Sequence, residues 1–164
     1  MSVMSASKWR WYGVALLAVL MDQLTKGLIT SVFELNEQVP VSAFFNLVYV
    51  LNPGAAFSFL AEAGGWQRYF FIVLALAVSA WLVLMLRAQR PRNEALGLSL
   101  VLGGAVGNVI DRIATGKVVD FLDFHWNGVH WPAFNLADVF INAGVALLLL
   151  ATFQEVSSQT SDIR

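Results

Sequence analysis

Long apolar runs separated by short polar segments form the dominant pattern of this chain. The runs predict four membrane-spanning helices, at about residues 11–31, 66–86, 96–113 and 133–153. A span needs about 20 mainly apolar residues, and the second run, WQRYFFIVLALAVSAWLVLML, meets that requirement most clearly. The pattern predicts an all-α polytopic membrane protein, with residues 1–164 forming a single membrane-embedded domain.

The first run carries charges near its far end. Residues 11–21 are uncharged but too few to cross a bilayer, so this helix spans only if it also holds Asp22 and Lys26. These two residues stand at helix positions i and i+4, where each partly neutralises the other. A basic start and an apolar run also fit a cleaved signal peptide, but no A-x-A-like site follows Met21. We therefore expect this segment to be retained as an anchor.

The pattern changes between the first two spans, in residues 32–65. The run FFNLVYV is rich in aromatic and β-branched residues and predicts a strand, and Asn52-Pro53-Gly54 predicts a turn. The segment AAFSFLAEA predicts a short interfacial helix that ends at Gly64-Gly65. We expect a small β-cradle and this helix outside the bilayer, with residues 52–65 forming a mobile lid.

Glycine is frequent in the third span. Small residues allow helices to approach closely in lipid. The sequence therefore predicts that this span packs tightly against its neighbours through Gly97, Gly103, Gly104 and Gly107.

Composition supports the membrane assignment. Of the 164 residues, 58% are hydrophobic and 13% are charged, and the mean hydropathy is +0.67. A soluble domain carries about 25% charged residues. The net charge of −1 gives no reason to expect a nucleic-acid partner, and the lack of cysteine excludes disulfides, thiolate metal sites and a cysteine nucleophile.

The distribution of basic residues predicts the orientation in the membrane. Six of the ten lie at the same ends of the spans, namely Lys8, Arg10, Arg87, Arg90, Arg92 and, in the tail, Arg164. The other four are Lys26, Arg68, Arg112 and Lys117. The positive-inside rule then places residues 1–10, 87–95 and 154–164 in the cytoplasm. Residues 32–65 and 114–132 are expected on the outer side.

A polar stretch between the third and fourth spans, residues 107–138, carries the candidate chemistry. Carboxylates held at a membrane boundary cost free energy, so they indicate a functional site. Asn108, Asp111 and Arg112 fall on one face of the third helix. They either satisfy one another at a helix end or form a supporting shell for a catalytic group, and we favour the second interpretation.

Three further aspartates follow in this stretch. Asp120 and Asp123 lie in the extended-looking run VVDFLDF, where a spacing of three residues puts them on opposite faces of a strand. This spacing does not decide which of them faces a site. Asp138 stands three residues after Asn135, which predicts a capping box at the start of the fourth helix. A plain helix cap is the alternative interpretation.

If Asp120 approaches Asp138, the two carboxyl groups can act as an acid and a base. Two like charges in a partly desolvated pocket cannot both ionise cheaply, so one proton is shared. Such a pair can deprotonate a water molecule and protonate a leaving amide nitrogen. The helix N-terminus favours Asp138 as the anion, which leaves Asp120 as the acid.

A metal site is a weaker alternative. Asn127-Gly128 predicts a hairpin turn that places His125 opposite His130, near Asp123. A catalytic zinc site needs a third firm ligand, and the sequence contains no HExxH spacing. An interfacial hairpin with its tryptophans at headgroup depth explains the same residues, so we expect no metal. The chain also lacks G-x-S-x-G and S-x-x-K nucleophile motifs.

Five motifs in this order resemble those of the bacterial lipoprotein signal peptidases (signal peptidase II), a family of aspartic peptidases. They are DQLTK at 22–26, NPGAAFSF at 52–59, GNVIDR at 107–112, VVDF at 118–121 and PAFNLAD at 132–138. The resemblance covers nearly the whole chain.

The resemblance assigns roles that spacing alone leaves open. It implies that Asp120 and Asp138 are the catalytic pair, rather than Asp123 or Asp111. Residues expected to line or brace the site are Asp22, Lys26, Asn52, Gly54, Asn108, Asp111, Arg112 and Asn135.

The resemblance also implies the substrate and the surroundings of the enzyme. We expect cleavage of diacylglyceryl-modified prolipoproteins on the amino side of the lipidated cysteine, near the outer face of the bacterial inner membrane. No cofactor is expected, the lipid bilayer is the expected partner, and the enzyme is expected to be a monomer.

Two other function classes remain. A small ion-coupled transporter or channel subunit would also hold charges within its spans, but here the charges cluster at one end and no internal repeat is present. A structural scaffold leaves the aspartates of VVDF and FNLAD without a role.

Overall fold

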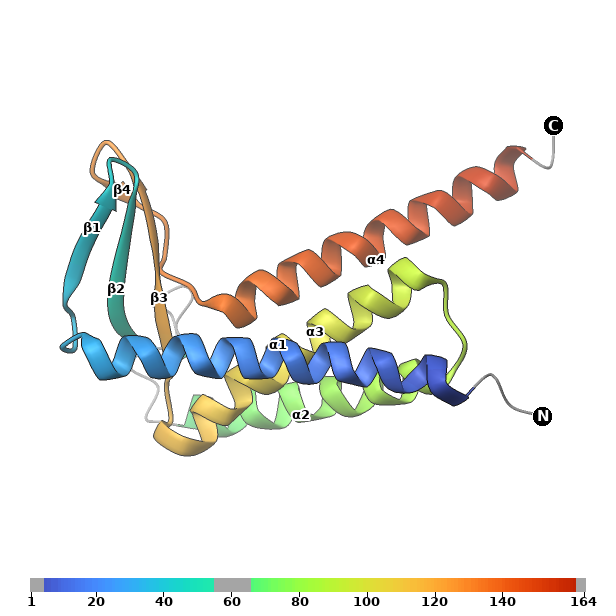
Figure 1. Cartoon of the computed structure of the whole chain (residues 1–164), viewed down its shortest axis with the longest axis horizontal. Helices are drawn as coiled ribbons and strands as arrows, with labels where there is room; N and C mark the ends of the chain where they lie inside the picture. Colours follow the sequence, from blue (N-terminus) through green and yellow to red (C-terminus); the bar gives the residue numbers. More distant parts are fainter. Residues whose placement is uncertain (1–4, 55–65, 162–164) are drawn as a thin grey trace.

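The computed structural model of the chain describes residues 5–54 and 66–161. Its elements in chain order are α1 (Ser5–Val32), β1 (Gln38–Ser42), β2 (Phe45–Asn52), α2 (Trp66–Arg87), α3 (Arg92–Thr115), β3 (Val118–Trp126), β4 (Val129–His130) and α4 (Leu136–Ser161). Figure 1 shows the strands gathered at one end of the helices, with the first turn of α1 and the last turn of α4 at the other.

Four helical stretches within the described residues are long and apolar enough to cross a membrane. They are Lys8–Val32, Arg68–Arg87, Arg92–Thr115 and Leu136–Gln154. The prediction of four spanning helices is therefore confirmed. The fourth helix begins at Leu136 rather than near Ala133, because the capping residue Asn135 ends the preceding extended segment.

α3 is the central helix of the bundle. Its apolar, span-length stretch is 61% buried, whereas the corresponding stretches of the other three helices are at most 28% buried. The reason is that α1, α2 and α4 all pack on α3. A Cβ atom added at Gly103 would lie 2.7 Å from the carbonyl oxygen of Ala15 in α1. One added at Gly97 would lie 2.8 Å from the carbonyl oxygen of Gly144 in α4. The predicted close helix contacts at these glycines are present.

The strands form an antiparallel sheet in the order β1-β2-β3-β4. The predicted strand FFNLVYV lies in β2, and the extended run around Asp120 is β3. In the register between them, Val50 is opposite Asp120 and Asn46 is opposite Asp123. The register shifts between Leu47 and Val50, so the two aspartates belong to separately aligned parts of the ladder.

A two-residue turn joins β3 to β4. Asn127 and Gly128 both have positive φ angles, 48° and 79°, as a type I′ turn requires. His125 pairs with His130 across the hairpin, and their rings stack with centroids 5.0 Å apart. The predicted hairpin is confirmed.

The predicted interfacial helix at residues 55–63 lies outside the described residues, as does most of the predicted lid at 52–65. The described part of that segment is the turn after β2, in which Gly54 adopts a φ angle of 100°.

Candidate active site

Five elements bring polar side chains together where the helices meet the sheet. α1 contributes Asp22 and Lys26, β2 ends at Asn52, and α3 contributes Asn108 and Asp111. β3 carries Asp120, and Asn135 precedes α4, which carries Asp138 in its first turn. Several of these side chains are almost inaccessible: Asp22 and Asn135 are 0% exposed, and Asp120 is 2% exposed.

Asp120 is held by two asparagine amides. Asn52 Nδ2 donates to its Oδ2 atom at 2.9 Å, and Asn135 Nδ2 donates to its Oδ1 atom at 2.7 Å. Burial raises the pKa of the Asp120 carboxyl from 3.8 to about 7. The negative charge of Asp138 acts in the same direction, and the two amide hydrogen bonds offset only part of the increase. Asp120 is therefore a carboxyl group that can keep a proton near neutral pH.

Asp138 completes the predicted capping box at the start of α4. Its backbone N–H donates to Asn135 Oδ1 at 3.0 Å, and the Asn135 backbone N–H donates to Asp138 Oδ2 at 3.2 Å. Its other carboxylate oxygen accepts a hydrogen bond from Asn108 Nδ2 at 2.9 Å. Asp138 is thus both a helix cap and a member of the polar cluster, and the two interpretations do not exclude each other.

Asn135 and Asn108 connect the two carboxyl groups. The Asn135 amide nitrogen donates to Asp120 and also, at 3.2 Å, to Asn108 Oδ1. The Asn108 amide nitrogen in turn donates to Asp138. Asp120 and Asp138 therefore share one amide network although they belong to different elements.

Lys26 supports this network from α1. Its ammonium group lies 2.8 Å from Asp22 Oδ2, 2.9 Å from Asp111 Oδ2 and 2.9 Å from Asn108 Oδ1. An ammonium group has three donors, and all three are satisfied here. The predicted i,i+4 pair of Asp22 and Lys26 is present, and Asp111 joins it as a second carboxylate.

Asp22 also fixes the start of α4. Its Oδ1 atom accepts a hydrogen bond at 2.9 Å from the backbone N–H of Ala137, one of the N–H groups that lack a partner within the helix. Because Ala137 adjoins Asp138, this contact ties the position of Asp138 to α1.

Gln23 belongs to the same polar network, although no sequence pattern singled it out. Its Nε2 atom lies 2.9 Å from Asp111 Oδ1, 3.2 Å from Asp22 Oδ2 and 3.1 Å from the Gly107 carbonyl oxygen. The position of Gln23 inside the DQLTK motif could have indicated this role. The residue type alone could not, because a glutamine beside a charged residue is common on helix surfaces.

Gly54 shapes the neighbourhood of Asn52. Its N–H donates to Asn52 Oδ1 at 2.8 Å, which leaves the Asn52 amide nitrogen directed at Asp120. A Cβ atom at Gly54 would lie 2.5 Å from the Phe71 ring, and the φ angle of 100° also requires glycine.

Arg112 lies at the edge of the cluster. Its guanidinium carbon is 5.2 Å from the centre of the Phe71 ring, and its charge interacts with Asp138, Asp120 and Asp111. It approaches no described carboxylate closely enough for an ion pair. Of the three residues predicted to share one face of the third helix, Asn108 and Asp111 form hydrogen bonds or ion pairs within the polar network, and Arg112 lies next to the network.

Asp123 belongs to a different environment. Asn46 Nδ2 donates to it at 2.7 Å, and His130 Nδ1 lies 2.9 Å from its carboxylate. Burial raises the pKa of Asp123, but these hydrogen bonds and the nearby histidines outweigh burial and lower it overall. Asp123 therefore takes no part in the Asp120 network, in agreement with the opposite strand faces that the spacing predicts.

The histidines of the hairpin are engaged with each other and with Asp123. The Nδ1 atom of His130 lies within hydrogen-bond distance of the Asp123 carboxylate, and the His125 ring stacks against the His130 ring. Among residues 5–54 and 66–161, no three His, Cys, Asp or Glu side chains gather where they could hold a metal ion.

Comparison with known proteins places this arrangement in a family. Residues 14–154 match the family model described as Signal peptidase (SPase) II. The lipoprotein signal peptidase of Cupriavidus necator is 52% identical over 147 residues, which cover 89% of this chain and 84% of that protein. That of Shewanella amazonensis is 48% identical over 157 residues, 94% of each chain.

Solved structures agree with the sequence comparisons. A bacterial membrane enzyme determined at 2.3 Å resolution has a TM-score of 0.80 and 30% sequence identity, covering 94% of this chain and 92% of its own. A second, determined at 1.9 Å, has a TM-score of 0.76 and 31% identity, covering 91% of this chain and 94% of its own. The relatives are peptidases, so they do not favour the transporter alternative. The chain is therefore a membrane-embedded member of the signal peptidase II family, the aspartic peptidases that process bacterial lipoproteins.

Proposed function

We propose that Asp120 and Asp138 are the catalytic pair of this lipoprotein signal peptidase. The observation that carries the proposal is the position of Asn135, which contacts both of them. Its side-chain amide donates to Asp120, while its backbone N–H donates to Asp138. One residue thus sets the position of each carboxyl group relative to the other.

The environments of the two aspartates support different roles. Asp120 is almost completely buried, and its raised pKa of about 7 suits a proton donor. Asp138 is partly exposed and lies in the first turn of α4, where the helix N-terminus favours a carboxylate anion. Asp120 is therefore the acid and Asp138 the base of the resting pair.

These roles define a balanced hydrolysis. The Asp138 carboxylate takes a proton from a water molecule, whose oxygen adds to the carbonyl carbon of the scissile peptide bond. The carbon–nitrogen bond then breaks, and the leaving nitrogen takes the proton of Asp120. Afterwards Asp138 carries a proton and Asp120 does not, so transfer of this proton between the two restores the resting state.

The remaining site residues position the pair. Asn52 and Asn135 hold Asp120, Asn108 holds Asp138, and Gly54 orients the Asn52 amide. Asp22, Lys26 and Asp111 brace Asn108 and the start of α4 from within the bundle. Arg112 adds positive charge close to both aspartates.

The substrate that fits this site is a prolipoprotein with diacylglycerol on its cysteine, cut on the amino side of that cysteine. Acyl chains in the bilayer would hold the scissile bond at the depth of the aspartates and so meet part of the entropic cost of alignment. The positions of Lys8, Arg10 and the 87–95 loop support cytoplasmic termini and a site at the outer face. The side chains that position Asp120 and Asp138 all belong to one chain, so the proposed site needs no second copy.

The proposed function is tested with purified enzyme in detergent and two forms of one prolipoprotein, with and without diacylglycerol. Cleavage of only the lipidated form is expected, and mass spectrometry should find the lipidated cysteine as the new N-terminus. A parallel reaction containing EDTA should run at the same rate. A cut at another bond, or equal cleavage of the unmodified form, would contradict the substrate assignment. Loss of activity in EDTA would contradict the metal-free mechanism.

The pH dependence of activity should report Asp120. Because the pKa of this acid is about 7, the fraction that carries the required proton falls above that pH. We expect kcat/KM to decline about tenfold per pH unit on the alkaline side. A rate that stays constant between pH 6 and about pH 9 would rule out Asp120 as the proton donor.

The stability of the folded protein should also depend on the protonation of Asp120. The unfolded chain releases the Asp120 proton near 3.8, whereas the folded protein keeps it until about 7. The stability contributed by the neutral carboxyl is thus complete below 3.8 and is lost as the pH rises to about 7. The Asp120→Asn variant should show a flatter dependence of its thermal midpoint on pH over this window. An identical slope in both proteins would contradict the raised pKa.

A further inference from the structure

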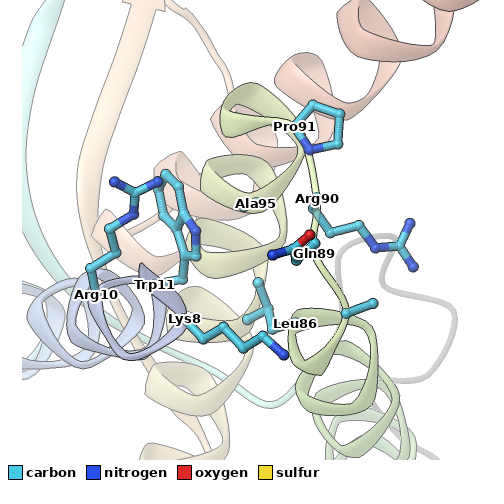
Figure 2. A pocket seen from close by; sticks show the side chains of 9 residues that line it. Lys8, Arg10, Trp11, Leu86, Gln89, Arg90, Pro91 and Ala95 are labelled. Carbon is cyan, nitrogen blue, oxygen red and sulfur yellow. The ribbon is translucent and has the colours of Figure 1, made fainter. Parts of the chain in front are cut away.

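A cavity with a volume of about 360 Å³ lies at the end of the bundle away from the sheet. Lys8, Arg10 and Trp11 of α1 lie across it from Gln89 and Pro91 in the loop between α2 and α3 (Figure 2). Water occupies about 30 Å³ per molecule in the liquid, so the cavity could hold a phosphate group with its ester substituent. It lies roughly 20 Å from Asp22 along α1, at about 1.5 Å per residue, and is separate from the active site.

The cavity carries an excess of positive charge. Lys8, Arg10 and Arg90 line it, and of these only Arg90 has an ion pair among the described residues, with Glu94. Arg87 and Arg92 lie in or beside the same loop and add to the positive potential. An anionic group would therefore be the complementary ligand.

The start of α3 adds to this positive potential. The Nε atom of Arg90 is buried without a hydrogen-bond partner among the described residues, but the Arg90 side chain extends away from Lys8 and Arg10 and pairs with Glu94 (Figure 2), so we do not count it as a ligand. α3 begins directly after Pro91, which supplies no side-chain hydrogen bond to cap it. The positive end of the α3 dipole is thus close to the cavity, where it favours an anion.

The surroundings indicate that this anion belongs to a lipid. The cavity lies at the ends of helices that are long enough to span, and Trp11, which lines it, is of a residue type that is enriched at membrane interfaces. α1 and α2 both pack on α3, and they meet each other near the cavity, where the Tyr12 hydroxyl donates to the Val83 carbonyl oxygen at 3.0 Å. Farther along the two helices their surfaces expose apolar side chains such as Leu17 and Leu84, which acyl chains can cover.

We propose that this cavity binds the phosphate headgroup of an anionic phospholipid, with the acyl chains lying along α1 and α2. Lys8 and Arg10 supply the charges that neutralise the phosphate, and the loop before α3 closes the other side. Basic pockets between spanning helices are suited to lipid headgroups of this kind. The site is independent of the catalytic pair.

The test uses two variants with the same change in charge. Lys8→Gln/Arg10→Gln removes two cations that line the cavity, and Arg87→Gln/Arg92→Gln removes two that do not. Native mass spectrometry in a neutral detergent would measure the binding of phosphatidylglycerol to each protein, with phosphatidylcholine of the same acyl chains for comparison. Inorganic phosphate would be added as a competitor in a separate series.

We expect the wild type to retain phosphatidylglycerol in preference to phosphatidylcholine. The cavity variant should bind phosphatidylglycerol roughly thirty-fold more weakly, since each of the two cations that line the cavity contributes about a fivefold factor to the binding of the phosphate. The control variant should lose far less. Peptidase activity in detergent should be the same in all three proteins, which would show that the variants fold.

Three outcomes would overturn the proposal. They are equal losses of binding in the two variants, no preference for the anionic lipid, and displacement of the lipid by inorganic phosphate at an equal concentration. The last outcome would assign the cavity to a free anion. A cavity variant that lost activity would be replaced by the single variant Lys8→Gln, for which about a fivefold weaker binding is expected.

Discussion

Replacing either Asp120 or Asp138 by asparagine should lower kcat/KM at least about a thousand-fold while the enzyme stays folded. An amide is close to a carboxyl in size but can neither take a proton from water nor give one to the leaving nitrogen. The two groups act as a unit, so the double variant should be no slower than the slower single variant. Initial rates with diacylglyceryl-modified prolipoprotein would measure the effect.

Asp123→Asn is the matched control for this experiment. It makes the same chemical change in the same strand, and Asp123 is also buried. Its carboxylate contacts Asn46 and His130 rather than the Asp120 network, so its substitution should change kcat/KM less than about tenfold. An effect equal to that of Asp120→Asn, or residual activity above about one per cent in Asp138→Asn, would contradict the assignment of the pair.

Replacing Lys26 by methionine should cause the largest loss of stability. The lysine is 3% exposed and is the shared partner of Asp22 and Asp111, so its removal leaves two buried carboxylates without a cation. Breaking a buried ion pair in this way costs about 3–5 kcal/mol. For a protein of this size that corresponds to a fall of roughly 10 °C in the thermal midpoint, which can be followed in detergent.

Two further variants separate this explanation from a general effect of losing a lysine. Lys117→Met removes an exposed lysine that has no ion pair within residues 5–54 and 66–161, and it should leave the thermal midpoint nearly unchanged. Adding Asp111→Asn to Lys26→Met removes one of the uncompensated charges and should restore part of the lost stability. If the double variant were less stable than Lys26→Met alone, charge compensation would not be the reason that Lys26 is needed.

Features that depend on residues close together in the chain could be predicted from the sequence. Four helices long enough to span follow from the apolar runs, because a bilayer requires backbone hydrogen bonds to be satisfied within each segment. The reciprocal bonds of Asn135 and Asp138 span three residues, and the hairpin at Asn127-Gly128 needs only two residues with positive φ. In each case the chemistry of a few neighbours is sufficient.

Which polar groups contact one another depends on the fold and could not be predicted from the sequence pattern. The β2–β3 register places Asp123 opposite Asn46 and Asp120 opposite Val50, two positions from Asn52, whose side-chain amide reaches Asp120. Resemblance to a family favoured Asp120, but neither composition nor spacing could.

The same holds for the braces behind the site. Lys26 reaches Asn108 across 82 positions of sequence, and Gln23 reaches Asp111 across 88. Such contacts exist because the glycines of α3 let α1 approach it closely, and a sequence pattern with a period of a few residues carries no information about that distance. Local hydrogen bonding therefore determines where the helices and turns of this protein form, and helix packing determines which polar side chains contact one another between them.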